Sequence, residues 1–313
     1  MKTIENHANR MLTRRDAVCG AVMSLASGLV PTFARASEGT EDFLDVWQAE
    51  TDQVRPEQYR RYLQTGTNPD GLDSLDRLER GFARVFKEIS ETKITGAPAV
   101  WLVYNMGVIV KTSQSLFSID LVHRRAPELA PKLDFALITH NHSDHYTPEF
   151  YRAMDGAGKT VINNFIDNYG AADWRKGGKY WEMGGYVRGT KVFKIRDVEI
   201  RTSLADHNAY LVDYTTAFEI RVGDWRMLHS GDCSNVKKLN PIWGSPDLWV
   251  QMPGLDNVVG ERRIKPKLTA FVHLWELGHD VGRITAKFLR PRIEKVRAAG
   301  GHVVVPLWGE RIV

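Results

Sequence analysis

The chain has 313 residues, of which 43% are hydrophobic and 26% are charged, so it is long enough to bury a substantial core. Residues 1–36 hold five of the 42 basic side chains and two of the 38 acidic ones, which leaves the remainder nearly neutral. A nearly neutral domain gives no electrostatic argument for nucleic acid as a partner. The chain has only two cysteines, which excludes a disulfide scaffold and a thiolate metal site.

The first 36 residues resemble a twin-arginine export signal. Arg14 and Arg15 precede an uncharged stretch at 17–30, and Ala34-Arg35-Ala36 offers small residues at the spacing of a cleavage site. The uncharged stretch is shorter than the ~20 apolar residues that a transmembrane helix needs, so no stable membrane span is expected in the mature chain. We therefore expect the twin-arginine machinery to export the protein to the periplasm or beyond. Cleavage would also remove Cys19 and leave Cys233 unpaired.

Residues 37–94 are predicted to form an N-terminal helical extension. The segment from Glu41 to about Ser90 is polar and helical in pattern, and Asp70-Gly71 is expected to separate two helices. Apolar residues recur every three or four positions along one stripe, which is typical of a helix packed on a core. The stripe consists of Leu75, Leu78, Phe82, Val85, Phe86 and Ile89.

Strands are predicted in two groups within a domain that spans 95–313. Two groups of strands with helices between and outside them favour an α/β sandwich, in which two sheets pack together under outer helices. The first group is expected at 99–104, 107–112, 116–120 and 133–139. The second group is expected at 191–194, 198–204, 217–222, 225–229, 248–250, 268–273 and 302–306, with a helix at about 283–299 that contains Pro291.

A histidine cluster follows the fourth predicted strand. His140, His142, Asp144 and His145 lie within six positions, although the whole chain has only ten histidines. Residues two apart in an extended loop point the same way, so His140 and His142 can share one metal ion. Asp144 and His145 then turn toward a second ion. Imidazole and carboxylate ligands suit Zn²⁺, and Fe or Mn fits a dinuclear site nearly as well.

The order of these residues resembles the metallo-β-lactamase superfamily over roughly residues 95–310. The resemblance implies an αβ/βα sandwich of two mixed β-sheets flanked by helices, with the metal site where loops from the two sheets converge. It also implies that His207 is the third ligand of the first ion. Asp232, in Ser230-Gly231-Asp232 after a strand, then matches the bridging carboxylate.

The resemblance implies a hydrolase that cleaves an ester, lactone, phosphodiester or amide of a small-molecule substrate with a metal-bound hydroxide. Asp144 is expected to orient that hydroxide and to carry its proton. Asp120 ends a short strand, and in the superfamily a carboxylate at this point often braces the histidine loop. A solvated aspartate at the end of the strand is an equal alternative.

The last ligand departs from the expected pattern. Within the superfamily, the chain resembles the branch of lactonases and phospholipase D-like enzymes that hydrolyse N-acylphosphatidylethanolamines. Members of that branch usually end with His-Trp-Gly or His-Tyr-Gly, whereas this chain has Leu307-Trp308-Gly309. We expect His279 to complete the second metal site from another loop, with His273 at a strand end as the weaker candidate.

Two alternatives to a hydrolase remain open. If neither histidine reaches the site, the protein is a periplasmic metal-binding or sensor protein with a degenerate one-metal site. The other alternative is a di-metal oxidoreductase that uses iron. Such members of the superfamily usually carry Glu at the position of His142, so His142 argues against this alternative.

Overall fold

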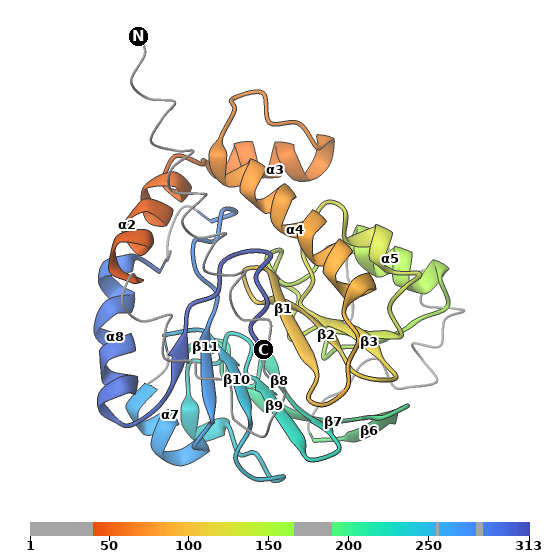
Figure 1. Ribbon diagram of the computed structural model, residues 1–313, viewed down its shortest axis with the longest axis vertical. Coiled ribbons are helices and arrows are strands. Elements are labelled where there is room, and N and C mark those ends of the chain that lie inside the picture. The colour runs from red at the N-terminus through yellow and green to blue at the C-terminus, as the bar shows by residue number, and fades with distance from the viewer. Residues whose placement is uncertain (1–39, 166–189, 255–256, 280–283) are drawn as a thin grey trace. The chain divides into compact units, whose positions relative to one another are not determined.

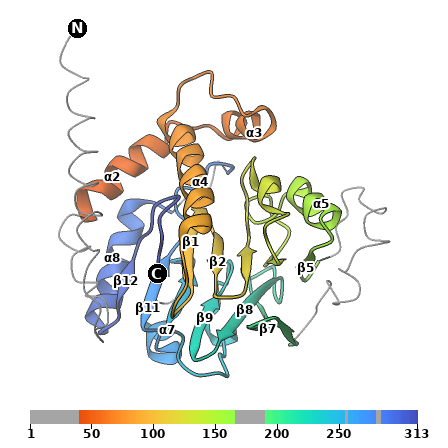
Figure 2. The same ribbon diagram turned by 45° about the vertical axis from the view of Figure 1, so that its right-hand side comes forward.

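The computed structural model describes residues 40–165, 190–254, 257–279 and 284–313. Glu41–Val313 form one compact unit, which Figures 1 and 2 show in two views. The predicted export signal lies outside the described residues. Within the described ranges, no helix is both long enough and apolar enough to cross a membrane.

The first sheet has five strands in chain order, and its first two form the predicted hairpin around Asn105-Met106. β2 is antiparallel to its neighbours β1 and β3, whereas β4 and β5 run parallel to β3. Both faces are covered, so nearly every strand residue is buried. The strands are β1 (Ala99–Tyr104), β2 (Gly107–Lys111), β3 (Leu116–Ile119), β4 (Phe135–Leu137) and β5 (Thr160–Ile162).

The second sheet has seven strands in the order β12-β11-β10-β9-β8-β7-β6. The strands from β6 to β9 form an antiparallel meander. Gly223-Asp224 make the predicted tight turn between β8 and β9, with Gly223 in the left-handed region at φ 58°. The strands from β9 to β12 are parallel. The seven are β6 (Val192–Ile195), β7 (Val198–Ala205), β8 (Thr215–Val222), β9 (Trp225–His229), β10 (Leu248–Gln251), β11 (Leu268–Phe271) and β12 (Val303–Val304).

Helices flank the two mixed sheets, as the predicted sandwich requires. α4 lies against β1, α5 against β5, and α8 against α7 and β12 (Figures 1 and 2). The predicted stripe on α4 is buried except at Phe86, and Pro291 lies inside α8 at an exposed position. The helices are α2 (Thr40–Thr51), α3 (Pro56–Thr65), α4 (Asp73–Glu91), α5 (Pro148–Gly156), α7 (Asn257–Ile264) and α8 (Ala286–Ala298), with short 3₁₀ turns η3 (Ala126–Leu129) and η5 (Val236–Lys238).

Among the described residues, α5, β5 and α7 were not predicted from the sequence pattern, and the segment expected to hold two helices holds three, α2, α3 and α4. β5 is three residues long and α7 eight, so neither is long enough to display a clear hydrophobic period. α5 begins at Pro148, a residue that favours the first turn of a helix. The remaining strands agree with the predicted ranges within a few residues at each end.

Strand direction brings the candidate ligands to one edge of the second sheet. β7 and β9 are both antiparallel to β8, and β11 is parallel to β9 through β10, so β7, β9 and β11 run the same way. Their carboxyl ends therefore meet at one edge, where His207, Asp232 and His273 follow.

Loops of the first sheet reach this edge through three hydrogen bonds. Thr216 N donates to Thr139 O at 2.9 Å, His273 N donates to Asn105 O at 3.1 Å, and His229 Nε2 lies 3.0 Å from Met106 O. These contacts tie the two sheets together at the candidate site.

Candidate metal centre

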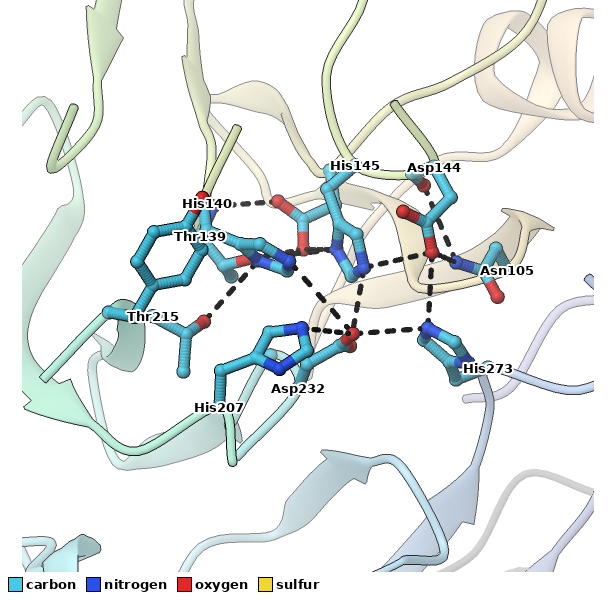
Figure 3. Close-up of polar contacts among 12 residues, drawn as sticks. Asn105, Thr139, His140, Asp144, His145, His207, Thr215, Asp232 and His273 are labelled. Atoms are coloured by element: carbon cyan, nitrogen blue, oxygen red, sulfur yellow. Dashed lines mark hydrogen bonds and ion pairs between the residues drawn. The ribbon is translucent and has the colours of Figure 1, made fainter. Parts of the chain in front are cut away.

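Three imidazoles form what we call the histidine group: His140, His142 and His207. One ring nitrogen from each lies within 4.8 Å of those of the others. His140 is fully buried, whereas the other two rings are partly exposed. The loop after β4 supplies the first two, and the loop after β7 supplies the third, so the group joins both sheets (Figure 3).

Two carboxylates and two imidazoles form what we call the mixed group: Asp144, His145, Asp232 and His273. His273 Nε2 lies 3.2 Å from Asp144 Oδ2 and 3.2 Å from Asp232 Oδ2. His145 Nε2 lies 3.3 Å from Asp144 Oδ2 and 3.2 Å from Asp232 Oδ1. The four side chains therefore converge on a small volume, and three of them are at least 96% buried.

Asp232 stands between the two groups. Its Oδ2 lies 3.4 Å from His207 Nε2 and 3.9 Å from His140 Nε2, and the same oxygen faces His273. Figure 3 shows the Asp232 carboxylate at the centre of these contacts. This position agrees with the bridging role that the resemblance implied for Asp232.

Six polar atoms that point into the centre lack hydrogen-bond partners. The Nε2 atoms of four histidines are buried without a partner of acceptable geometry, and so are one oxygen of Asp144 and one of Asp232. Buried polar atoms are almost always satisfied, because leaving one unpaired costs about 1–3 kcal/mol. Metal ions would satisfy these lone pairs together, so the side chains present fit the implied cofactor. The four histidines are His140, His145, His207 and His273.

Electrostatics separates the two groups. Burial lowers the pKa of His140 well below its usual value, and burial together with His207 lowers the pKa of His142. In the mixed group burial acts in the same direction, but Asp232, Asp144 and Asp120 outweigh it and raise the pKa of His145 well above its usual value. Burial is likewise outweighed at His273, where Asp232 and Asp144 raise the pKa to about 10.

The two carboxylates of the mixed group remain ionised. Burial alone would raise the pKa of Asp144 and of Asp232, but His145 and His273 hold both well below the usual range. A buried pair of carboxylates is a strong attraction for a divalent cation.

Asp120 braces His145, which decides between the two readings of this strand-end residue. Asp120 is fully buried, and its Oδ2 lies 2.9 Å from His145 Nδ1. The carboxylate accepts from Nδ1–H, so the Nε2 lone pair of His145 faces the mixed group. Asp120 also accepts from Thr139 N and Thr139 Oγ1, each at 2.7 Å.

Asn105 braces the other side of the mixed group. Its Nδ2 donates to Asp144 Oδ2 at 2.9 Å, and its backbone oxygen accepts from His273 N. Asn105 has φ 51° and His273 has φ 61°, so both residues occupy the left-handed region that most side chains avoid. The sharp turns allow the loop after β1 and the loop after β11 to meet at Asp144.

Gly231 is required by the close approach of three loops. It has φ 52°, and a β-carbon there would lie 2.8 Å from Thr215 Oγ1 and 3.0 Å from Thr139 Cβ. Ser230-Gly231-Asp232 is therefore more than a turn signal, because only glycine lets Asp232 approach the histidine loop.

Six of the seven predicted ligand positions lie in the two groups, and His279 does not. Its Nδ1 lies 3.0 Å from Glu276 Oε2, and its side chain is 46% exposed. His273 occupies the place expected for His279, because β11 ends at the same sheet edge as β9. The prediction that His279, rather than His273, completes the second metal site is therefore wrong.

The segment that carries Leu307 packs elsewhere. Trp308 stacks edge-on against Trp47 and near Tyr104, at centroid distances of 5.2 Å and 5.3 Å. Gly309 N donates to Leu102 O in β1. The absence of a histidine at position 307 does not deprive the mixed group of a ligand, since His273 supplies one from β11.

Sequence reasoning also missed Asn105 and Tyr214. Tyr214 lies beside the histidine group, with its ring centroid 5.4 Å from that of His142 and 5.9 Å from that of His207. Its hydroxyl donates to Asn141 Oδ1 at 2.5 Å. Neither residue belongs to a motif, so only the turn dipeptide Asn105-Met106 gave a signal.

No family model matches the chain, and no curated protein matches it. Several solved structures are similar in fold. The metallo hydrolase Igni18 from the hyperthermophilic archaeon Ignicoccus hospitalis KIN4/I is 16% identical with a TM-score of 0.50, and the match covers 69% of this chain and 97% of that one. CmlA, a diiron β-hydroxylase from Streptomyces venezuelae, is 14% identical with a TM-score of 0.50, over 71% of this chain and 54% of that one.

The metallo-β-lactamase fold protein YhfI from Bacillus subtilis is 13% identical with a TM-score of 0.49, over 68% of this chain and 98% of that one. At such low identities a likeness shows the fold alone. The two mixed sheets and flanking helices have the metallo-β-lactamase fold, which confirms the predicted fold class. The neighbours include metal-dependent hydrolases and a diiron hydroxylase, and the predicted branch of the superfamily stays a prediction.

Proposed function

We propose that the protein is a metal-dependent hydrolase in which each of the two groups holds one metal ion. The observation that carries this proposal is the convergence of seven side chains whose inward-facing atoms include buried, unpaired imidazole nitrogens. The histidine group would hold the first ion and the mixed group the second, with Asp232 shared between them. The donors are imidazole nitrogens and carboxylate oxygens, which suit Zn²⁺, Fe or Mn.

When bound, such ions acidify a coordinated water and stabilise negative charge that develops on the substrate. The chain itself must orient the attacking water and accept its proton. Asp144 is placed for this role, because Asn105 Nδ2 donates to its Oδ2, while its buried Oδ1 has no hydrogen-bond partner. His145 and His273 keep Asp144 ionised, and therefore able to accept a proton at Oδ1.

The substrate that we propose is a small molecule with an ester, lactone, phosphodiester or amide bond. The fold hosts several chemistries, so it does not choose among these bonds. The degenerate one-metal alternative is weakened by His273, which completes the mixed group with a fourth side chain. One of the proteins of similar fold is a diiron hydroxylase, which keeps the oxidoreductase as the alternative. His142, which lies in the histidine group, favours the hydrolase.

Metal content tests the proposal directly. We expect about two ions per chain by elemental analysis of protein folded without chelator. His140→Ala and His273→Ala should each retain about one ion, whereas His302→Ala, a change at an exposed histidine, should retain about two. One ion or none in the wild-type protein would overturn the dinuclear centre. Hydrolysis of ester, lactone, phosphodiester and amide probes, with oxygen consumption by iron-loaded protein as the opposing assay, then separates hydrolase from oxidoreductase.

Export through the twin-arginine machinery is a separate part of the proposal. It rests on Arg14, Arg15 and the uncharged stretch that follows them. Replacing both arginines with lysine should retain the full-length chain inside the cell, whereas the wild-type chain should reach the periplasm in a form shortened by about 36 residues. Equal fractionation of the two chains would remove this assignment.

A further inference from the structure

The loop that carries His273 has a strained backbone. It follows β11, and we call its residues 272–279 the His273 loop. His273 at φ 61° and Trp275 at φ 58° both lie in the left-handed region, although neither is glycine. Residues with a β-carbon occupy this region at a cost, so they persist there only where the surrounding structure holds them. The position of His273 in the mixed group therefore depends on the residues that hold this loop.

Trp47 of α2 packs against the middle of the His273 loop. Its ring meets that of Trp275 edge to face, with centroids 5.7 Å apart and an interplanar angle of 65°. Trp47 is 6% exposed and Trp275 2% exposed, so the contact is buried, and buried aromatic pairs of this geometry are favourable. Trp47 is itself fixed by Trp308, at a centroid distance of 5.2 Å, and by the Arg77 guanidinium, 5.3 Å from its ring. Trp275 is therefore pressed against a ring that has little freedom to move.

Tyr59 of α3 packs against the far end of the His273 loop. A β-carbon at Gly278 would lie 3.6 Å from both Cδ1 and Cε1 of Tyr59, so the ring is close to this residue. The Tyr59 ring also lies beside that of Tyr104, with centroids 5.4 Å apart. Tyr104 Oη accepts from Leu277 N at 2.7 Å and donates to Glu276 Oε1 at 3.2 Å. The far end of the loop is thus held by a tyrosine of β1 and by the tyrosine of α3 that packs beside it.

We propose that Trp47 and Tyr59 are positioning residues for the second metal ion, so that the N-terminal helices are part of the metal centre. The proposal rests on the proposed dinuclear function and deepens it. His273 Nε2 now lies 3.2 Å from an oxygen of Asp144 and 3.2 Å from one of Asp232. Without the ring of Trp47 or of Tyr59, the His273 loop can relax toward ordinary backbone angles, and the imidazole then leaves this position.

The effect should be confined to one half of the centre. The histidine group takes its three imidazoles from the loops after β4 and β7, and none from the His273 loop. The mixed group takes one of its four ligands from the His273 loop. A change at Trp47 or Tyr59 that acts through this loop therefore weakens the mixed group and spares the histidine group. A general loss of stability would weaken both.

Competition between the protein and a chelator for Zn²⁺ tests this difference. The His140→Ala background reports the mixed group, and the His273→Ala background reports the histidine group. Trp47→Leu and Tyr59→Leu should each lower the Zn²⁺ affinity of the mixed group about 10-fold to 100-fold, and that of the histidine group about threefold or less. Circular dichroism establishes that each variant is folded.

The conservative variants and a matched control sharpen the test. Trp47→Phe and Tyr59→Phe keep an aromatic ring against the loop, so the affinity of the mixed group should return to within about fivefold of the wild-type value. Trp243→Leu removes an aromatic ring of the second sheet that lies 4.9 Å from the Arg221 guanidinium. This control should leave the affinity of both groups unchanged.

The visible spectrum of bound Co²⁺ gives a second readout, because it reports the geometry of the ligands around the ion. At saturating Co²⁺ in the His140→Ala background, Trp47→Leu should change the spectrum of the mixed group, and Trp47→Phe should return it toward the wild-type form. In the His273→Ala background neither change should alter the spectrum. A merely destabilised protein would bind Co²⁺ with an unaltered spectrum in both backgrounds.

The outcomes separate this proposal from the proposed function. Wild-type affinity and spectrum in folded Trp47→Leu and Tyr59→Leu would overturn the positioning role and leave the dinuclear centre intact. Equal losses at both groups would also overturn it. Should Trp47→Leu fail to fold, Tyr59→Leu decides by the same two measurements. If the wild-type protein bound no Zn²⁺ in the mixed group, the proposed function would fail and the positioning role with it.

Discussion

The two halves of the candidate centre differ in charge and in support. The histidine group is three imidazoles with no carboxylate of its own, and two of its rings are partly exposed. The mixed group adds two ionised carboxylates, and three of its four side chains are buried. Asp232 stands between the two groups, so its charge attracts a divalent cation to both, and the mixed group adds the second carboxylate of Asp144.

The two groups also differ in the residues that hydrogen-bond to their ligands. His145 is held by the Asp120 carboxylate at 2.9 Å, and Asp144 by the Asn105 amide at 2.9 Å. His140 Nδ1 instead faces two hydroxyls, Thr139 Oγ1 at 3.0 Å and Thr215 Oγ1 at 3.5 Å. Preorganised ligands lose less entropy on binding, so the mixed group should bind its ion the more tightly. The absence of a histidine at position 307 had suggested the opposite order.

The largest effect is expected from Asp144→Asn. The change removes the proton acceptor at Oδ1 while leaving the histidine group untouched, so kcat should fall by on the order of 100-fold to 10,000-fold. Elemental analysis should still find the ion of the histidine group. Asp224→Asn, in the exposed β8–β9 turn, is the matched control and should keep full activity. Undiminished turnover in Asp144→Asn would remove Asp144 from its proposed role.

Asp120→Asn should act on one half of the centre only. The amide oxygen can still accept from Thr139 N, but the charge that orients His145 is lost. Affinity at the mixed group should fall about 10-fold to 100-fold, with the histidine group unchanged. Titration against a competing chelator, in His140→Ala and His273→Ala backgrounds, measures each site by itself. A loss shared equally by both groups would contradict the division between them.

The sequence predicted the fold and most of the centre because both depend on local patterns. Apolar runs located the strands, and the histidine motif follows β4 directly, so His140, His142, Asp144 and His145 could be assigned without a structure. His273 could not be ranked correctly, because its place depends on the order of β9, β10 and β11 in the sheet. The resemblance led us to expect a histidine at position 307, and when the sequence showed Leu307 there, we took His279 on another loop as the replacement.

The supporting residues were predictable only in part. Asp120 ends a strand, which suggested a brace but could not exclude a solvated side chain. Asn105 acts through a left-handed turn, and its two contacts join residues 39 and 168 positions away, Asp144 and His273. Such contacts have no sequence period, since they arise only when the two sheets meet.

The metal affinities of the two groups should also differ in their dependence on pH, and this effect should be smaller than that of Asp120→Asn. The raised pKa values of His145 and His273 mean that, without a metal ion, both imidazoles bind a second proton at neutral pH, and an ion entering the mixed group must displace that proton from each ring. Affinity there should weaken about tenfold per pH unit for each proton displaced as the pH falls, and strengthen toward pH 10. The lowered pKa values of His140 and His142 leave those rings neutral, so the histidine group should be flat through the neutral range. Chelator competition at several pH values gives both slopes, and parallel slopes would contradict the assignment.

The smallest effect is expected from Thr215→Val, which probes the weaker support of the histidine group. Thr215 is fully buried, and valine has nearly its shape but cannot hydrogen-bond to His140 Nδ1. Thr139 Oγ1 remains within 3.0 Å of that nitrogen, so affinity at the histidine group should fall by about 1 kcal/mol or less, roughly fivefold at most. The mixed group should be unaffected in the same chelator titration. A loss as large as that from Asp120→Asn would mean that a neutral hydroxyl orients His140 as strongly as a carboxylate orients His145, and the contrast in support would then disappear.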